Sequence, residues 1–429
     1  MKKFLLTSVL FVFSIDFVFS QTINTRFSSY FYTWSRLDSV FSSNSTTHIR
    51  GYQNLLLDVN IKKWTLNTYL QTEEDVIKRI GRGFGYRFYS LYLKGSNLFN
   101  LLDLKLGRQY LSAGTGKGTI DGLYFKLKLG QNKEYQIIGY GGELTPLSYE
   151  IEKYPSLKDN YTFGGQFIYY GLKDLMLSLS YTNKHRKPIS YYALRLDSLF
   201  NTKEVLVETD SPADQLAGFD FNYALFGKHN IYGRAYYDIN TNRFLKGEIN
   251  VGAEITNRIH ASAGYIYREP QISYNSLFWV FNHKQSQEVE MGVDYTFPNN
   301  INVFGRLSEV IYQNDNSAKL VIGFNHPSFG FSFSKYFKYT GEADGFYGFI
   351  SQEIVKSKLS VNGSINYSRY AISEYASEKQ TIFGGTLGLT YRPLPSISID
   401  AQGQIFTNPD YDYDSRFLVG FSYWLFSRF

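Results

Sequence analysis

Several stretches of this chain alternate between apolar and polar residues, and this period of two constrains the fold more than any other feature. From Leu245 to Ile255 the odd positions are apolar or small, whereas the even positions include Lys246, Glu248 and Glu254. The same division runs through 288–297, 359–367 and 397–405. Because successive side chains of a strand point to opposite faces, each stretch predicts a β-strand with one apolar and one polar face. Their length, about nine to eleven residues, is that of a tilted membrane-spanning strand.

Two kinds of connection alternate between the predicted strands. Short turns are predicted at 226–230, 256–258, 298–300, 326–328, 355–357 and 392–396. Between them lie mostly longer or more polar links at 268–285, 313–317, 340–344, 372–379 and 408–414. Short turns at one end and longer loops at the other are typical of outer-membrane barrels. A secreted all-β sandwich, the main alternative, has no reason to keep this two-sided rhythm.

The predicted fold is therefore all-β: a single transmembrane antiparallel up-and-down barrel over 21–429. About 24 strands are expected, or 22 if 189–209 is an outer loop instead of two wall strands. Both counts are even, as a barrel with both termini at one end requires. The first strand, near 25–34, is expected to pair with the last one, since this removes the open sheet edge.

The first twenty residues have the pattern of a secretory signal peptide. Met1-Lys2-Lys3 precedes an apolar run over 4–13, and Ser20-Gln21 follows as a cleavage position. This run is too short to cross a bilayer as a helix, which needs about 20 residues. We therefore predict a signal peptide over 1–20.

Composition narrows the partners and the chemistry. The chain has 38 Tyr, 36 Phe and 4 Trp, and such rings favour the bilayer interface. It has no Cys, which excludes disulfides and Cys-based metal sites. The net charge of +6 is modest for a chain of this length, whereas proteins that bind nucleic acid concentrate basic charge on one face. No nucleic-acid partner is therefore expected. The six His residues lack ligand spacing, and no cofactor, metal site or enzymatic activity is predicted.

The C-terminal segment carries a family resemblance. Val419, Phe421, Tyr423, Leu425 and Phe429 share one parity, and the segment resembles the closing strand of bacterial outer-membrane β-barrels. Ser427 departs from the family, which usually has a further aromatic residue there. The resemblance implies a bacterial outer-membrane location, contact with outer-membrane lipid, and recognition of Phe429 by the barrel-assembly machinery.

Strand parity predicts which charged side chains face the lumen. The early wall contributes mainly cations and the later wall mainly carboxylates, a division that would favour polar solutes. The alternative is that these groups only solvate the lumen or pair across strands. The candidate lumen residues are Lys105, Lys126, Lys128, Arg234, Lys246, Glu248, Glu254, Glu288, Glu290, Asp294, Arg306 and Asp400.

A second resemblance covers 104–125. Gly107-Arg108-Gln109 ends a strand, a Gly-rich link follows, and Asp121-Gly122 opens the next strand. This hairpin is similar to one in porin and alginate-export-like outer-membrane channels. The resemblance implies an ion pair between Arg108 and Asp121 at the barrel mouth, with Gln109 and Lys117 near a solute path. The parity that Arg108 shares with Leu106 requires a position beyond the lipid edge or a bulge. The alternative is a simple turn that uses Gly for its conformational freedom.

The expected function is a porin-like channel for passive diffusion or export of polar solutes. Saccharides are included because the link 142–160 offers aromatic and charged side chains, Tyr149 among them. The alternative is a non-conducting barrel that docks a partner of a secretion or envelope-assembly system. The apolar stretch 277–281, in the long link after 268, is a candidate to bind a partner or to fold inward and narrow the pore. The alternative is that it buries itself against other loops.

Overall fold

The computed structural model describes residues 21–37, 45–77, 83–151, 156–188, 190–196, 198–208, 210, 213–270, 285–312, 315–338, 343–371, 378–408 and 411–428. The predicted signal peptide, the apolar stretch 277–281 and Phe429 lie outside these residues and remain predictions. No helix in the described part is long and apolar enough to cross a membrane.

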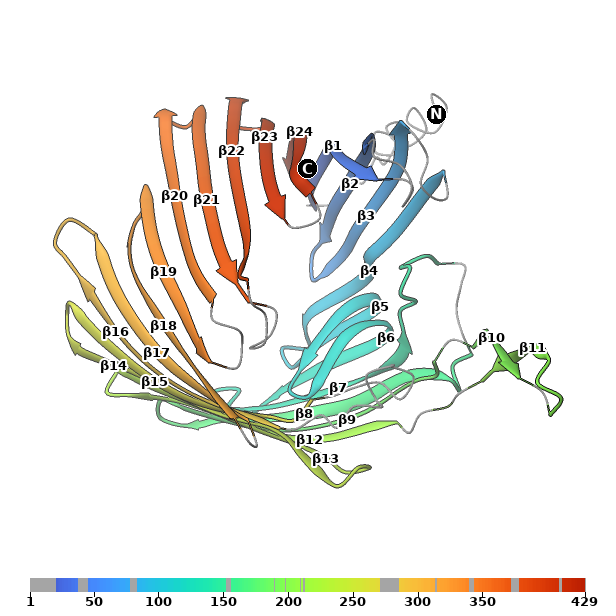
Figure 1. The fold of residues 1–429 in the computed structure, drawn as a ribbon. Helices are drawn as coiled ribbons and strands as arrows, with labels where there is room; N and C mark the ends of the chain where they lie inside the picture. Colours follow the sequence, from blue (N-terminus) through green and yellow to red (C-terminus); the bar gives the residue numbers. More distant parts are fainter. Residues whose placement is uncertain are drawn as a thin grey trace.

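The described chain consists of 24 strands (Figure 1). The first half contains β1 (Gln21–Leu37), β2 (Ser45–Ile61), β3 (Trp64–Ile77), β4 (Phe84–Leu98), β5 (Leu102–Ala113), β6 (Gly116–Leu129), β7 (Tyr135–Leu144), β8 (Asn160–Leu172), β9 (Leu175–Arg186), β10 (Tyr191–Leu196), β11 (Thr202–Val207) and β12 (Asp214–Leu225). The second half contains β13 (His229–Asp238), β14 (Arg243–Thr256), β15 (Ile259–Arg268), β16 (Ser286–Thr296), β17 (Asn302–Tyr312), β18 (Asp315–His326), β19 (Phe329–Lys338), β20 (Ala343–Val355), β21 (Leu359–Tyr370), β22 (Gln380–Leu394), β23 (Ile397–Asn408) and β24 (Tyr411–Arg428).

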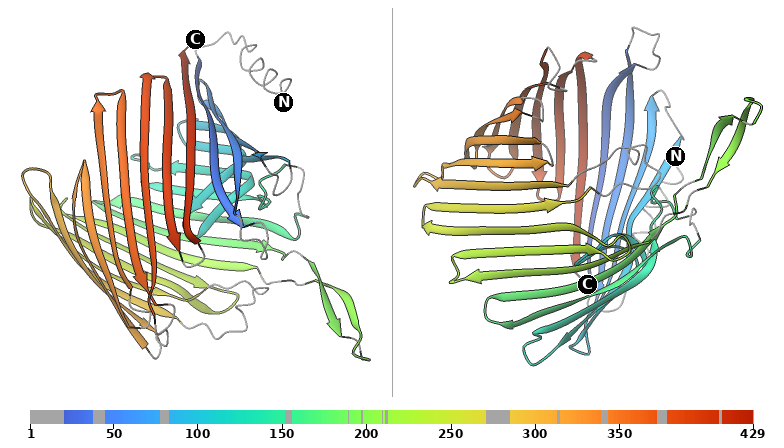
Figure 2. Two further views of the ribbon diagram at one scale, coloured as in Figure 1. Left: turned by 45° about the horizontal axis from the view of Figure 1, so that its top comes forward. Right: turned by 60° about the horizontal axis from the view of Figure 1, so that its bottom comes forward.

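The sheet closes on itself because its first and last strands pair. β1 is antiparallel to β24 from Thr22 opposite Arg428 to Tyr32 opposite Leu418. At this seam the buried hydroxyls of Ser28 and Ser422 lie 2.9 Å apart. β1 and β24 accordingly run side by side in Figures 1 and 2. The predicted pairing of the first strand with the last is confirmed, and the closed sheet has 22 strands.

The remaining two strands stand outside the wall. β10 and β11 pair only with each other in a sheet of their own, and this hairpin projects from the barrel (Figure 2). β9 pairs directly with β12, for example Tyr181 opposite Ala217. The stretch 189–209 is therefore part of a loop, and the predicted alternative of 22 wall strands is the correct count.

The two ends of the barrel differ in their connections. At the end where Thr22 lies opposite Arg428, the links hold two to five residues, such as 62–63 and 130–134. At the opposite end they range from two residues to the 27 of 187–213, which include the projecting hairpin. The predicted alternation of short turns and longer links is confirmed for the barrel as a whole. The longer links predicted at 313–317 and 408–414 are wrong, because β18 already begins at Asp315 and β24 at Tyr411. In outer-membrane barrels, the short turns are periplasmic.

The outer face of the wall is apolar and the inner face is polar. Ile249, Met291, Leu307 and Ile365 are all exposed on the outside, and polar residues occupy the positions between them. The predicted alternation is confirmed, with one correction. Leu245 is buried rather than outward, because a bulge in the β13–β14 pairing leaves this residue without an opposite partner.

Candidate functional site in the lumen

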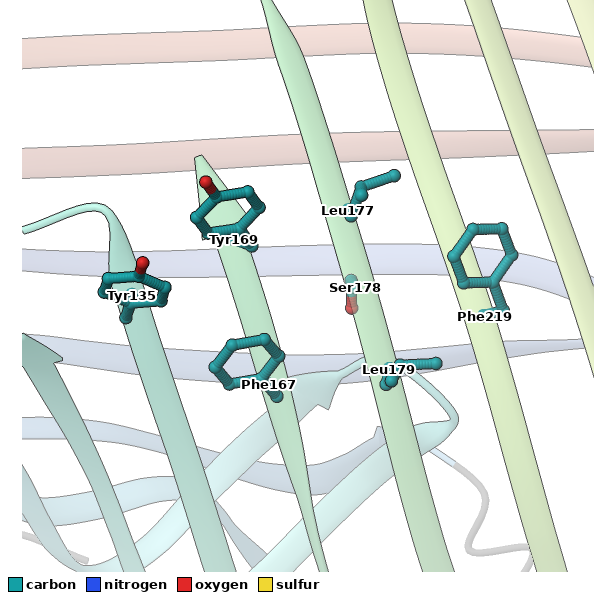
Figure 3. A pocket seen from close by; sticks show the side chains of 7 residues that line it. All are labelled: Tyr135, Phe167, Tyr169, Leu177, Ser178, Leu179 and Phe219. Carbon is teal, nitrogen blue, oxygen red and sulfur yellow. The ribbon is translucent and has the colours of Figure 1, made fainter. Parts of the chain in front are cut away.

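The hairpin formed by β5 and β6 folds into the barrel. At its tip, the Thr115 amide donates to Ser180 Oγ at 3.1 Å, and Thr115 Oγ1 lies 2.8 Å from Thr182 Oγ1. The Tyr236 hydroxyl donates to the Gly114 carbonyl at 3.3 Å. Ser180 and Thr182 alternate with the exposed Leu179 on β9, so they face inward. The hairpin therefore lies across the inner wall, and Figure 3 shows it crossing obliquely behind the wall strands.

Glycine makes the inward bend possible. Gly107 has a φ of +117°, and a Cβ atom there would overlap the carbonyl oxygen of Leu91. The β4–β5 pairing ends one residue later, at Leu91 opposite Arg108. Since residues with a side chain rarely adopt this conformation, glycine lets β5 leave the wall here.

Close approach at the tip also requires glycine. A Cβ atom on Gly114 would overlap the Ser180 side chain, and one on Gly218 would lie 2.5 Å from Thr115 Cγ2. Gly218 belongs to β12 in the wall, whereas Gly114 belongs to the hairpin. Small residues on both surfaces thus allow the backbone of the tip to touch the wall.

The bend reverses which hairpin residues are exposed. Leu111 and Ala113 are buried against Ile138 and Tyr140 of β7 in the main apolar cluster. Tyr110, between them and the bend, is 64% exposed. The side of β5 that carries Tyr110 faces lipid before the bend. After the bend it faces the open lumen, because the opposite side of the hairpin now covers the inner wall.

Arg108 lies at the bend and stabilises it through an ion pair and hydrogen bonds. Its guanidinium donates to both carboxylate oxygens of Asp121, at 2.8 and 3.0 Å. It also donates to the carbonyls of Phe88 at 3.0 Å and Tyr149 at 2.7 Å. The side chain is 3% exposed. The structure thus pairs the two residues through an inward bend, which also resolves the parity conflict with Leu106.

Gln109 and Lys117 differ in their surroundings. Gln109 is buried, and its amide donates to the carbonyls of Lys105 and Gly122. It therefore supports the hairpin and does not line the expected solute path, because the bend turns its side chain toward the wall. Lys117, near the tip, is exposed.

The predicted cations of the early wall lie on the inner faces of β5 and β6. Lys128 forms a 2.5 Å ion pair with Asp103, and Lys126 lies opposite Asp103 in the register. The Lys105 ammonium lies over the rings of Tyr92 and Tyr124, 5.4 and 5.2 Å from their centres.

A row of alternating charge crosses the later wall beside the hairpin tip. Arg234 of β13 lies between Asp220 of β12 and Glu248 of β14 in the register. It forms a 2.7 Å ion pair with Asp220, and Lys246 forms a 2.6 Å pair with Glu248. The row continues through Ile266 to Glu288 of β16. Asp220 was not among the predicted residues, although it has the inward parity between Phe219 and Phe221.

The other predicted residues also have nearby partners. Asp294 accepts from Arg306 at 3.2 Å, and Glu290 accepts from Ser308 at 2.9 Å. Asp400 accepts from Thr390 and Ser398, and Glu254 lies opposite His260 in the register. Pairing along and across strands thus offsets much of the expected division between a basic and an acidic wall.

A shallow depression on the outer wall belongs to the lipid-facing surface. Tyr135, Phe167, Leu179 and Phe219 line it together with Tyr169, Leu177 and Ser178 (Figure 3). The aromatic and leucine side chains come from β7, β8, β9 and β12 and alternate with the inward residues of the same strands. Their apolar character suits lipid acyl chains rather than a polar solute.

A closed 22-stranded antiparallel barrel with an apolar exterior, a polar interior and short turns at one end defines the protein class. The chain is a transmembrane β-barrel of the bacterial outer membrane.

Comparisons with known proteins agree with this fold. The chain is similar to the ferric enterobactin receptor PfeA (R480A_Q482A mutant) from Pseudomonas aeruginosa, with a TM-score of 0.58, 9% identity and coverage of 94% of this chain and 80% of that chain. Lower TM-scores relate it to OccAB4 from Acinetobacter baumannii (0.44; 8% identity; 96% and 99% covered) and to a BenF-like porin from Pseudomonas fluorescens Pf-5 (0.45; 8% identity; 95% and 99% covered). No protein-family model matches the sequence, and comparison with curated proteins finds no match.

Proposed function

We propose that this barrel is a passive channel for polar solutes whose lumen is narrowed by the β5–β6 hairpin. The observation that carries the proposal is the polar inner wall, in which Asp220, Arg234 and Glu248 form a charged row beside the hairpin tip. Bore grows with strand number, and a barrel of 16 to 18 strands already leaves an aqueous channel. A wall of 22 strands therefore leaves room for a channel even with an inserted hairpin.

Glu288 and Glu290 are the proposed selectivity residues of this channel. Both lie on the inner face of β16, on alternate positions between outward-facing Val289 and Met291. Two carboxylates on one strand of the lumen raise the local concentration of cations. The other candidate lumen charges would tune this preference through their ion pairs.

The solute class is proposed to include saccharides. Tyr89 lies 4.8 Å from Tyr69 and 5.0 Å from Tyr149, measured between ring centres. Beside these rings, the Tyr89 hydroxyl donates to Gln71 Oε1, and Gln71 Nε2 donates to Asn54. Aromatic rings bordered by amide groups provide both an apolar surface and hydrogen bonds for a hydroxyl-rich solute.

Planar-bilayer conductance of the purified chain tests the channel. We expect a steady ohmic current, and we expect Glu288→Gln plus Glu290→Gln to reduce its preference for cations. A matched control is Glu204→Gln plus Glu208→Gln, which removes the same charge from the projecting loop. Absence of current from correctly folded protein would contradict the channel, and equal effects of both variants would contradict the selectivity residues.

One observation favours the second candidate, a non-conducting barrel that docks an envelope partner. The β10–β11 hairpin projects from the wall and exposes Tyr192, Leu194, Leu196 and Leu206 on one face. Isolated two-stranded hairpins are marginally stable in water, and exposed apolar patches commonly mark interaction sites. This function predicts no conductance and co-purification of an envelope protein that is lost when 191–207 is replaced by a short polar linker.

A further inference from the structure

A row of charged side chains crosses β19, β20 and β21 near the end opposite the short turns. Lys335 lies opposite Asp344, and Asp344 lies opposite Arg369. The ion pairs to Asp344 measure 3.5 Å from Lys335 and 3.1 Å from Arg369. Lys379, just before β22, places a third cation 3.9 Å from the same carboxylate. These three cations and one carboxylate together carry a net charge of plus two.

The charged row lies on the lipid-facing side of the wall. Two residues from the charged row toward the short turns, Phe333, Phe346 and Tyr367 lie opposite one another in the register. The rings of Phe346 and Tyr367 stack with their centres 4.9 Å apart. A further two positions along lie Phe331 and Ile365, which are exposed. Alternate residues of a strand share one face, so these rows all face outward.

The order of the rows locates the membrane edge. At about 3.3 Å per residue, consecutive rows are roughly 7 Å apart. An aromatic row therefore separates the charged row from the apolar band, as the aromatic girdle of an outer-membrane barrel does at the interface. The charged row lies at the level of lipid headgroups, on the side of the membrane opposite the short turns.

We propose that Lys335, Arg369 and Lys379 bind the phosphate group of an outer-leaflet lipid whose acyl chains lie over Phe346 and Tyr367. Ammonium and guanidinium groups form charge-assisted hydrogen bonds with phosphate oxygens, and basic clusters at membrane surfaces attract anionic lipids. Asp344 gathers the cations before the lipid arrives, which lowers the ordering cost of binding. Free phosphate has the same headgroup chemistry but nothing to cover the aromatic row.

The test measures lipid binding to the full chain in detergent by native mass spectrometry. The probes are bisphosphorylated lipid A, the same lipid without its phosphates, and inorganic phosphate as a competitor. The test variant combines Lys335→Gln, Arg369→Gln and Lys379→Gln. Far-UV circular dichroism and heat-dependent gel mobility check that each barrel is folded.

A matched control removes the same charges at the other end of the same wall sector. Lys356, Lys358 and Arg392 line a depression with Trp424 at the short-turn end. Lys356→Gln, Lys358→Gln and Arg392→Gln together therefore change the same residue types, two lysines and one arginine, away from the proposed site.

We expect the test variant to bind bisphosphorylated lipid A at least about tenfold more weakly than the parent chain, and the control variant to bind like the parent. Lipid without phosphates should bind the parent weakly, and millimolar phosphate should compete poorly. If both variants lost lipid A binding equally, the effect would come from overall charge, and the proposed site would be overturned. Equal binding of both lipids would overturn phosphate recognition, and full displacement by inorganic phosphate would assign the row to free phosphate instead of a lipid.

Discussion

Thr115 Oγ1 lies 2.8 Å from Thr182 Oγ1, which bonds the tip of the β5–β6 hairpin to the inner face of β9, 67 residues further along the chain. The Tyr140 hydroxyl lies 2.6 Å from the same Thr182 oxygen, so the contact belongs to a buried network of hydroxyl groups. Because buried polar groups are costly to leave without partners, this network favours the inward position of the hairpin.

Gly218→Val should displace the hairpin tip from the wall and raise single-channel conductance. A Cβ atom at this position would lie 2.5 Å from Thr115 Cγ2, and overpacking a close contact costs about 1–3 kcal/mol. Gly252→Ala is the control, since its nearest neighbour is the end of the His260 side chain at 3.2 Å. Unchanged conductance in a folded Gly218→Val barrel would show that the hairpin does not limit the current.

Arg108→Gln should destabilise the β5–β6 hairpin by about 3 kcal/mol, since losing one partner of a largely buried ion pair leaves the Asp121 carboxylate with the long 3.4 Å hydrogen bond from Thr145 Oγ1 in place of two guanidinium bonds. Guanidinium unfolding in detergent micelles measures the loss, and limited proteolysis should show faster cleavage within 109–120. Arg243→Gln is the comparison, because its ion pair with Glu269 is largely exposed and should contribute less than about 1 kcal/mol. Similar losses from both substitutions would contradict the role of Arg108 at the bend.

Arg234→Gln should increase the preference of the channel for cations. The substitution removes the positive charge between Asp220 and Glu248, so the row becomes more negative. Reversal potentials in a salt gradient measure the change, and Asp220→Asn should shift them in the opposite direction. Shifts of the same sign in both variants would contradict an electrostatic role for the row.

Ser422→Val should weaken the seam that closes the barrel. Ser422 is fully buried, and its hydroxyl lies 2.9 Å from Ser28 Oγ and 3.2 Å from the Tyr30 hydroxyl. Leaving buried polar partners unsatisfied costs about 1–3 kcal/mol, which should lower the midpoint of thermal unfolding. Ser112→Val changes an exposed hydroxyl on the hairpin and should have an effect below about 0.5 kcal/mol. Equal midpoints for the two variants would contradict the seam contribution.

The strands and their faces followed from local pattern, but the register between neighbouring strands did not. The alternation through Met291 and Val293 correctly predicted an outward apolar face on β16. Leu245 has the same local pattern and is nevertheless buried, because a bulge in the pairing with β13 displaces it. Asp220 had the correct inward parity, yet its importance appears only when the register places Arg234 opposite it.

The sequence alone determined the all-β class, the apolar exterior, the end with short turns and the pairing of first and last strands. Each depends on side-chain alternation along one strand, on local turn residues, or on the need to leave no open edge in a membrane. Only the tertiary structure decided that β10 and β11 stand outside a 22-stranded wall and that the β5–β6 hairpin folds inward. Both outcomes depend on which distant segments compete for the same partners. β12 pairs with β9 and so leaves β10 and β11 outside the wall, and Thr182 of β9 bonds Thr115 at the hairpin tip. Local periodicity carries no information about that competition.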